Sequence, residues 1–170
     1  NIYLSQKQID WWKKLYFYGL GEFFYKNNIK TNIDEFMNIT AGTNKLLKSE
    51  INISDEFTGA LVPIGGGKDS IVTLNVIKDD FANNMCYVIN PRGATEETAE
   101  TAGYGENKRC YVKRTLDKNM LELNKQGYLN GHTPFSSIVA FSALIVAYLN
   151  KKKYIVLSNE ASANESTIYE

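Results

Sequence analysis

The sequence has 170 residues, of which 44% are hydrophobic and 22% are charged, as is typical of a soluble globular domain. Basic and acidic residues both number 19, so the chain lacks the basic excess of a general nucleic-acid-binding protein. The longest apolar run, Ile138 to Leu149, is shorter than the ~18–20 residues of a membrane span and predicts a buried core helix. We therefore expect no nucleic-acid partner, no membrane partner and a cytoplasmic location.

Residues 1–58 are predicted to form a helical N-terminal segment. Ser5 and Gln8 have the spacing of a capping box at the start of a helix. Aromatic residues are dense from Trp11 to Tyr25, and they either pack against the rest of the domain or form a surface for an adenine ring or a partner domain. The polar stretch from Asn32 to Leu47 is compatible with one short helix and a loop.

From residue 59 onward, strand patterns alternate with helix patterns, which predicts an α/β fold with a parallel sheet flanked by helices. We therefore expect a nucleotide-binding α/β domain over residues 59–170. The predicted strands cover residues 60–64, 85–90, 109–113 and 154–158, and the predicted helices cover 69–78, 95–102, 116–126 and 134–149. The two cysteines, Cys86 and Cys110, lie in strand patterns and are predicted to be buried free thiols.

Ligands of parallel sheets bind beyond the carboxyl ends of the strands. This rule predicts that three segments surround one crevice, namely Gly65–Ser70, Asn90–Gly93 and Ser158–Glu160.

The most informative motif follows the first predicted strand and reads Gly65-Gly66-Gly67-Lys68-Asp69-Ser70. Glycines let a phosphate approach the backbone, and the N–H groups at a helix start attract anions. Lys68 would neutralise phosphate charge, Asp69 would hold Mg²⁺, and Ser70 with the backbone N–H groups would donate to phosphate oxygens. The spacing fits neither a Walker A loop nor the GxGxxG pattern. A plain glycine turn before a helix is the structural alternative.

This run resembles the PP-loop of the ATP pyrophosphatase superfamily, whose pattern is Ser-Gly-Gly-x-Asp-Ser. The resemblance implies a HUP-like α/β fold, with ATP and Mg²⁺ as cofactors and cleavage of ATP between its α and β phosphates. Gly65 stands where that pattern has its leading serine, so one phosphate contact of the superfamily would be missing.

A second motif, Tyr128 to Pro134, contains His132, the only histidine of the chain. Asn130-Gly131 indicates a turn, and Pro134 is typical of a first helical turn. His132 is either a structural loop residue or a functional one that carries a proton or binds a substrate carboxylate.

Two further segments follow predicted strands. Asn90 and Arg92 are candidates for contacts with the ribose or the adenine, and Arg92 could instead bind a substrate carboxylate; a plain turn is the alternative. Asn159 is a candidate for nucleotide binding, and Glu160 is a candidate for catalysis or metal binding. Their alternative is a solvated loop.

Together, the run Gly65–Ser70, the segment Leu129–Pro134 and the segment Ser158–Ala163 resemble the UDP-N-acetyl-α-D-muramoyl-L-alanyl-L-glutamate epimerase family. The resemblance implies that ATP activates the terminal glutamate carboxylate of a UDP-muramoyl dipeptide as an adenylate. A base then removes the acidified α proton, and reprotonation on the other face gives D-glutamate, for peptidoglycan precursors. His132 and Glu160 are the candidate bases.

Members of that family are longer at the carboxyl end, and this chain begins with Asn1 and ends shortly after the apolar Ile168. We therefore expect a fragment whose C-terminal region, or a partner segment, completes the active site.

Two other functions remain open at this point. One is another PP-loop reaction, such as nucleobase or tRNA modification, sulfur transfer or amide formation. The separated cysteines and the zero net charge argue against the zinc-binding and RNA-binding branches. The other is a nucleotide-binding module without catalysis, against which Lys68, Asp69 and Ser70 argue.

Overall fold

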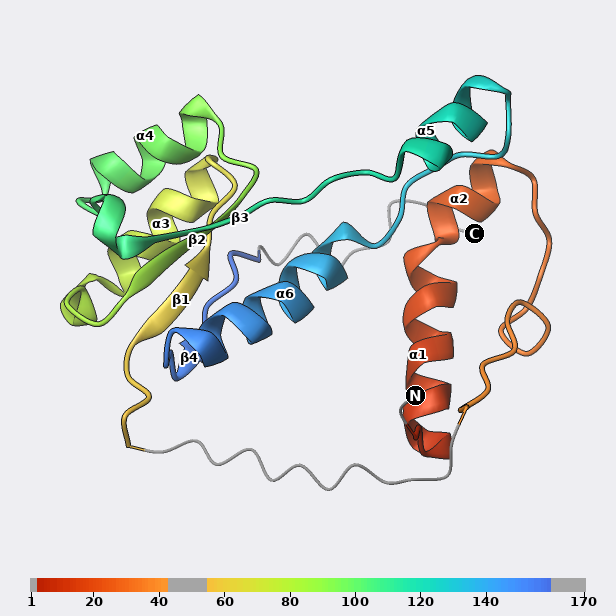
Figure 1. The fold of residues 1–170 in the computed structure, drawn as a ribbon, viewed down its shortest axis with the longest axis horizontal. Helices are drawn as coiled ribbons and strands as arrows, with labels where there is room; N and C mark the ends of the chain where they lie inside the picture. The colour runs from red at the N-terminus through yellow and green to blue at the C-terminus, as the bar shows by residue number, and fades with distance from the viewer. Residues whose placement is uncertain (1–2, 43–54, 160–170) are drawn as a thin grey trace. The chain divides into compact units, whose positions relative to one another are not determined.

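The computed structural model describes residues 3–42 and 55–159. The chain forms two compact units, drawn in Figure 1. The first comprises Asn1–Asn52 and Leu116–Ser137, and the second comprises Ile53–Thr115 and Ile138–Glu170.

The described helices of the first unit are α1 (Gln6–Gly19), α2 (Gly21–Lys26) and α5 (Lys118–Lys125). The predicted capping box of α1 is confirmed: the backbone N–H of Gln8 donates to Ser5 Oγ at 3.3 Å, and the backbone N–H of Ser5 donates to Gln8 Oε1 at 2.9 Å. Among the described residues 32–42, the chain forms turns, bends and irregular segments but no helix. The rest of the predicted stretch to Leu47 lies outside the described residues.

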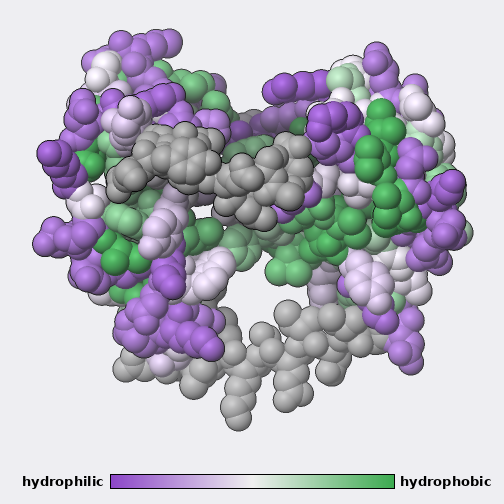
Figure 2. Space-filling view, turned by 180° about the vertical axis from the view of Figure 1, so that it is seen from behind, coloured by the Kyte–Doolittle hydropathy of each residue, from purple (hydrophilic) through white to green (hydrophobic). Residues whose placement is uncertain are grey.

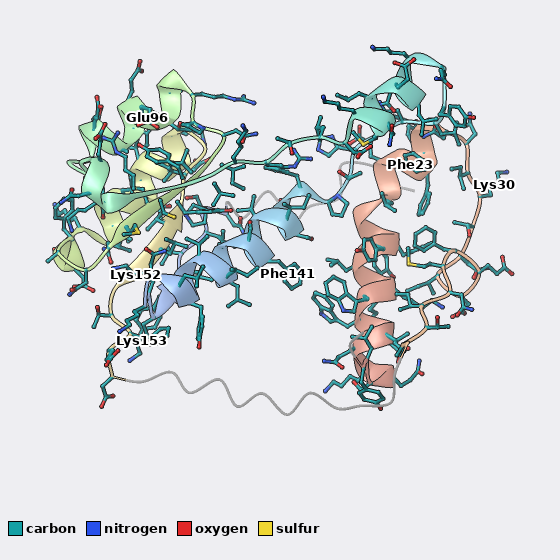
Figure 3. All side chains as sticks on the ribbon, viewed as in Figure 1. Phe23, Lys30, Glu96, Phe141, Lys152 and Lys153 are labelled. Atoms are coloured by element: carbon teal, nitrogen blue, oxygen red, sulfur yellow. The ribbon has the colours of Figure 1, made fainter. Side chains whose placement is uncertain are left out.

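The segment around Asn130 packs closely on α2. A Cβ built on Gly131 would lie 2.9 Å from Phe23 Cδ2, and Asn27 Nδ2 donates to the carbonyl of Asn130 at 3.1 Å. Phe23 is labelled on α2 in Figure 3. These contacts explain why residues 116–137 group with the N-terminal helices, whereas the predicted domains cut the chain once, after residue 58.

The second unit contains a four-stranded parallel sheet in the order β3-β2-β1-β4, which confirms the predicted α/β class. The central strand β1 is paired on both sides, since Leu61 lies opposite Met85 of β2 and opposite Ile155 of β4. The strands are β1 (Ala60–Pro63), β2 (Met85–Ile89), β3 (Arg109–Val112) and β4 (Tyr154–Ile155).

Helices cover both faces of this sheet (Figure 1). On one face, Val62 and Val88 pack with Leu74 of α3 and Ala99 of α4. The strand residues that alternate with them point to the other face, where they pack against α6. The helical elements are α3 (Lys68–Val76), η1 (Lys78–Asp80), α4 (Gly93–Thr101), η2 (Glu106–Lys108) and α6 (Phe135–Leu149), of which the part from Ile138 onward belongs to this unit.

The prediction that the run Ile138–Leu149 is a buried core helix is wrong for most of its surface. The buried positions of α6 are Ala143, Val146 and Ala147, whereas Leu149 is 72% exposed. Figure 2 shows hydrophobic surface over this helix. The exposed residues of α6 include Phe141, Leu144, Ile145 and Tyr148. An apolar composition on all sides suggested burial on all sides, but the sheet covers only the face with small residues.

Among the described residues, no helix is long and apolar enough to cross a membrane.

The two cysteines are free thiols, as predicted, and they lie on opposite faces of the sheet. Cys86 is fully buried, and this burial raises the pKa of its thiol to about 12. Burial also raises the pKa of Cys110, which is only partly buried.

We predict that native Cys86 resists iodoacetamide at pH 8, because the thiolate is the reactive form and almost none is present far below the thiol pKa. Mass spectrometry of a Cys110→Ser variant should show alkylation only after denaturant is added. Rapid alkylation of the native variant would contradict the burial of this strand.

Candidate functional site

The glycine-rich loop connects β1 to α3 at the point where the order of the sheet reverses. The chain passes from β1 to β2 and β3 on one side, and β4 returns to the other side of β1. In open α/β sheets, ligands bind outside the carboxyl ends of the strands at such a switch point. The fold therefore places Gly65–Ser70 where a ligand of this sheet is expected.

Gly66 brings the loop into close contact with the start of α4. Its φ is +87°, and a Cβ at this position would lie 2.8 Å from the carbonyl carbon of Ala94 and 2.9 Å from the backbone nitrogen of Thr95. These neighbours are backbone atoms of a helix and cannot move aside cheaply. Only glycine fits there, so the first turns of α3 and α4 flank the same loop.

The first turn of α4 is held by its own threonine. Thr95 Oγ1 accepts from the backbone N–H of Arg92 at 2.9 Å and donates to the carbonyl of Arg92 at 2.7 Å. Because Thr95 is buried, this arrangement fixes the backbone against which Gly66 packs. The side chain of Arg92 takes no part in it and Arg92 is exposed.

A buried arginine attaches α4 to β3. The side chain of Arg109 is 3% exposed, its Nη1 lies 2.6 Å from Glu96 Oε2, and its Nε donates to the carbonyl of Tyr104 at 2.7 Å. Glu96 is labelled on α4 in Figure 3. Since a buried charge without its partner is costly, this pair fixes α4 firmly beside the loop.

The two ends of the loop are joined by a hydrogen bond. The backbone N–H of Gly65 donates to Ser70 Oγ at 3.1 Å, and Ser70 is buried. The Ser70 hydroxyl acts here as an acceptor, so its proton can still be donated to a ligand oxygen. The Cβ positions of Gly65 and Gly67 face open space, with no atom within 4 Å.

The helix that follows the loop starts without a side-chain cap. Gly67 is the N-cap residue of α3 and offers no side-chain hydrogen bond, so the first N–H groups have no partner within the helix. Lys68 and Asp69 occupy the first turn, and Lys68 Nζ lies 2.7 Å from Asp69 Oδ1. N–H groups, a lysine and a carboxylate at one helix start suit a phosphate that carries a metal ion.

These residues fit a magnesium–nucleotide better than an isolated magnesium ion. Among residues 3–42 and 55–159, no group of three histidine, cysteine or carboxylate side chains could hold a metal ion. Protein-bound Mg²⁺ often uses only one or two carboxylates together with phosphate oxygens. Asp69, whose side chain is 49% exposed, can supply that single carboxylate.

The segment after β4 contacts α3 through a pair of hydroxyl groups. Thr73 Oγ1 and Ser158 Oγ are 2.8 Å apart, and Thr73 lies one helical turn after Ser70. The exposed Asn159 follows directly, while Glu160 lies outside the described residues. The structure thus places Ser158 against α3, one helical turn after Ser70, and the crevice expected at the loop stays a prediction. Thr73 was not predicted, and its i+3 spacing from Ser70 was the available signal.

The side chain of Asn90 is engaged in a structural role. Its φ is +50°, its Nδ2 donates to the carbonyl of Arg114 at 2.8 Å, and its Oδ1 accepts from the backbone N–H of Arg114 at 2.8 Å. Both ends of the amide are thus used to join the chain after β2 to the chain after β3. The nucleotide contacts expected of Asn90 and Arg92 stay predictions.

His132 belongs to the first unit, whereas the glycine loop belongs to the second. Its Nδ1 lies 3.7 Å from Glu22 Oε2 of α2, and its side chain is 73% exposed. Glu22 also pairs with Lys26 at 2.6 Å, and the hydrogen bond from Lys26 is the largest cause that lowers the pKa of Glu22. The catalytic role of His132 stays a prediction.

We predict that Gly66→Ala destabilises the protein by about 3 kcal/mol, because the new Cβ meets the backbone of α4 and φ is positive. Gly65→Ala is the matched control: its Cβ enters open space, and we expect a change within about 0.5 kcal/mol. Urea denaturation of both variants measures the difference. Equal stabilities would contradict the packing of the loop on α4.

The profile of a family described as "MurL N-terminal domain" matches residues 1–170. Among curated proteins, the chain is similar to three that are each named UDP-N-acetyl-alpha-D-muramoyl-L-alanyl-L-glutamate epimerase. The protein from Micromonospora is 30% identical over 154 residues, which are 91% of this chain and 33% of that protein. Those from Salinispora tropica and Xanthomonas oryzae are 27% and 29% identical, and the match covers 91% and 89% of this chain and 32% of each relative.

The chain therefore spans about one third of the length of these relatives. No solved structure matches it.

Proposed function

Because the chain belongs to the MurL N-terminal domain family, we propose that it is the nucleotide-binding part of an epimerase. The substrate would be UDP-N-acetylmuramoyl-L-alanyl-L-glutamate, named in the three similar proteins, and the product would carry D-glutamate. The observation that carries the nucleotide part of this proposal is the glycine loop, in which Gly66 packs on α4 and α3 begins without a side-chain cap.

In the proposed reaction, the terminal glutamate carboxylate would attack the α phosphate of ATP, and pyrophosphate would leave. After the α proton has been exchanged, water would hydrolyse the acyl-adenylate to AMP and the free carboxylate of D-glutamate. Activation is required because a free carboxylate resists loss of the neighbouring proton: a second negative charge would build up next to the first. The protein's task is to bind the phosphates and to stabilise the charge on the leaving group.

Each residue of the loop has one role in this proposal. The N–H groups at the start of α3 and the Ser70 hydroxyl bind phosphate oxygens, and Lys68 offsets their charge. Asp69 would hold the magnesium ion through its exposed carboxylate. The hydroxyl pair of Thr73 and Ser158 keeps the chain after β4 beside the same helix.

Proton transfer at the glutamate α carbon needs a base, for which His132 and Glu160 are the candidates. His132 is exposed and has a carboxylate neighbour in Glu22. A region that corresponds to the other two thirds of the relatives' length would supply any remaining groups.

We predict that Asp69→Asn lowers the formation of AMP and D-glutamate by about 100-fold or more in the full-length protein, because the amide removes the charge that holds Mg²⁺. The control is Asp79→Asn, which changes an exposed aspartate in the short helix η1 and should retain activity. The assay supplies ATP, Mg²⁺ and the UDP-muramoyl dipeptide, and measures AMP, pyrophosphate and glutamate chirality. Removing Mg²⁺ with a chelator should abolish all three signals.

Full activity of Asp69→Asn would contradict the assignment of the loop. AMP formation without D-glutamate would favour another adenylating reaction, of the kind that PP-loop proteins carry out. Nucleotide binding without AMP from any substrate would favour a binding module.

A further inference from the structure

The first unit contains a cavity of about 360 Å³ beside α1. This volume lies within the range of about 300–1,000 Å³ that is usual for small-molecule sites. Residues of the helix and of the chain after α2 line it, and they are Lys7, Asp10, Trp11, Lys13, Lys14, Ile33 and Asp34.

The helix register explains why these residues gather. Lys7, Trp11 and Lys14 stand at positions i, i+4 and i+7 of α1, which places them along one face of the helix. Trp11 is 49% exposed, so part of its ring is accessible from this side. The rings of Trp11 and Trp12 are in edge-to-face contact, with an interplanar angle of 82° and centroids 5.0 Å apart.

The charges of the cavity favour an anion. Three lysines and two aspartates line it, so its net charge is positive. Lys13 is engaged with the backbone carbonyl of Asp34 at 3.3 Å, and Asp10 accepts from Gln6 Nε2 at 2.8 Å. Within the described part of the chain, neither Lys7 nor Lys14 has a carboxylate at ion-pair distance.

We propose that this cavity binds the nucleoside diphosphate moiety of the substrate, with the base on Trp11 and the diphosphate on Lys7 and Lys14. This inference rests on the proposed function, in which the substrate is a uridine diphosphate conjugate. An aromatic ring stacks on a planar base, and two lysines match two adjacent phosphates. The carboxylates of Asp10 and Asp34 can accept hydrogen bonds from the ribose hydroxyls or from the imide N–H of uracil.

The test is a titration of the chain with UDP, followed by tryptophan fluorescence. Trp11 and Trp12 are the only tryptophans of the sequence, so the signal reports on this helix. We expect saturable quenching by UDP, and we expect Lys14→Glu and Lys7→Glu each to weaken it by about 10-fold or more. Lys30→Glu is the matched control, because Lys30 is exposed, lies after α2 in the same unit (Figure 3) and does not line the cavity.

Trp11→Phe keeps a ring for stacking and should retain binding in a competition assay, whereas Trp11→Ala should lose it. Circular dichroism verifies that each variant is folded. Quenching that Lys14→Glu leaves unchanged would overturn the proposal, and so would equal affinity for ADP, which would show that the cavity does not select a uridine nucleotide.

The experiments distinguish a wrong assignment of the cavity from a wrong assignment of the epimerase activity. If the full-length protein makes AMP and D-glutamate while Lys14→Glu keeps the wild-type KM for the UDP-muramoyl dipeptide, the cavity is not the site and the function stands. If UDP binds through Lys14 but no AMP forms with the dipeptide, the site stands and the function fails.

Discussion

The contact between the Gly66 backbone and the first turn of α4 is the constraint on which the candidate site depends. The backbone of Ala94 and Thr95 lies so close that no side chain fits at Gly66. This contact sets the path of the loop, and the path decides where α3 begins and which N–H groups its first turn presents. Thr95 and Arg109 hold α4 in place from within the core, so the shape of the loop is built into the packing of the second unit.

Some residues of the candidate site are used by the fold, whereas others have exposed side chains or open space beside them. Asn90 has both ends of its amide bound to the backbone, and Gly66 is required by packing. By contrast, open space lies above Gly65 and Gly67, and Lys68 and Asp69 are exposed at the start of an uncapped helix. A backbone fixed by packing beside exposed charges suits the proposed binding of a magnesium–nucleotide, because such a site loses little entropy when it binds.

Much of the second unit could be predicted from the sequence, because its signals are local. Strand patterns that alternate with helix patterns gave the parallel sheet, and the glycine run gave the start of α3. Three features were not predicted. They are the exposure of Leu144 and Leu149, the hydroxyl pair of Thr73 and Ser158, and the grouping of residues 116–137 with the N-terminal helices. Each of these depends on which distant segment lies next to a residue, and a single sequence does not carry that information.

The most direct test of the account is an NMR titration of the glycine-labelled chain with Mg²⁺ and ATP. The chain has 12 glycines, which include the three of the loop and Gly19 and Gly131 of the first unit. The account predicts that the backbone N–H signals of Gly65, Gly66 and Gly67 shift most, that pyrophosphate alone reproduces part of the change, and that Asp69→Asn weakens it. Loop signals that stay in place while ATP shifts glycines elsewhere would contradict the account.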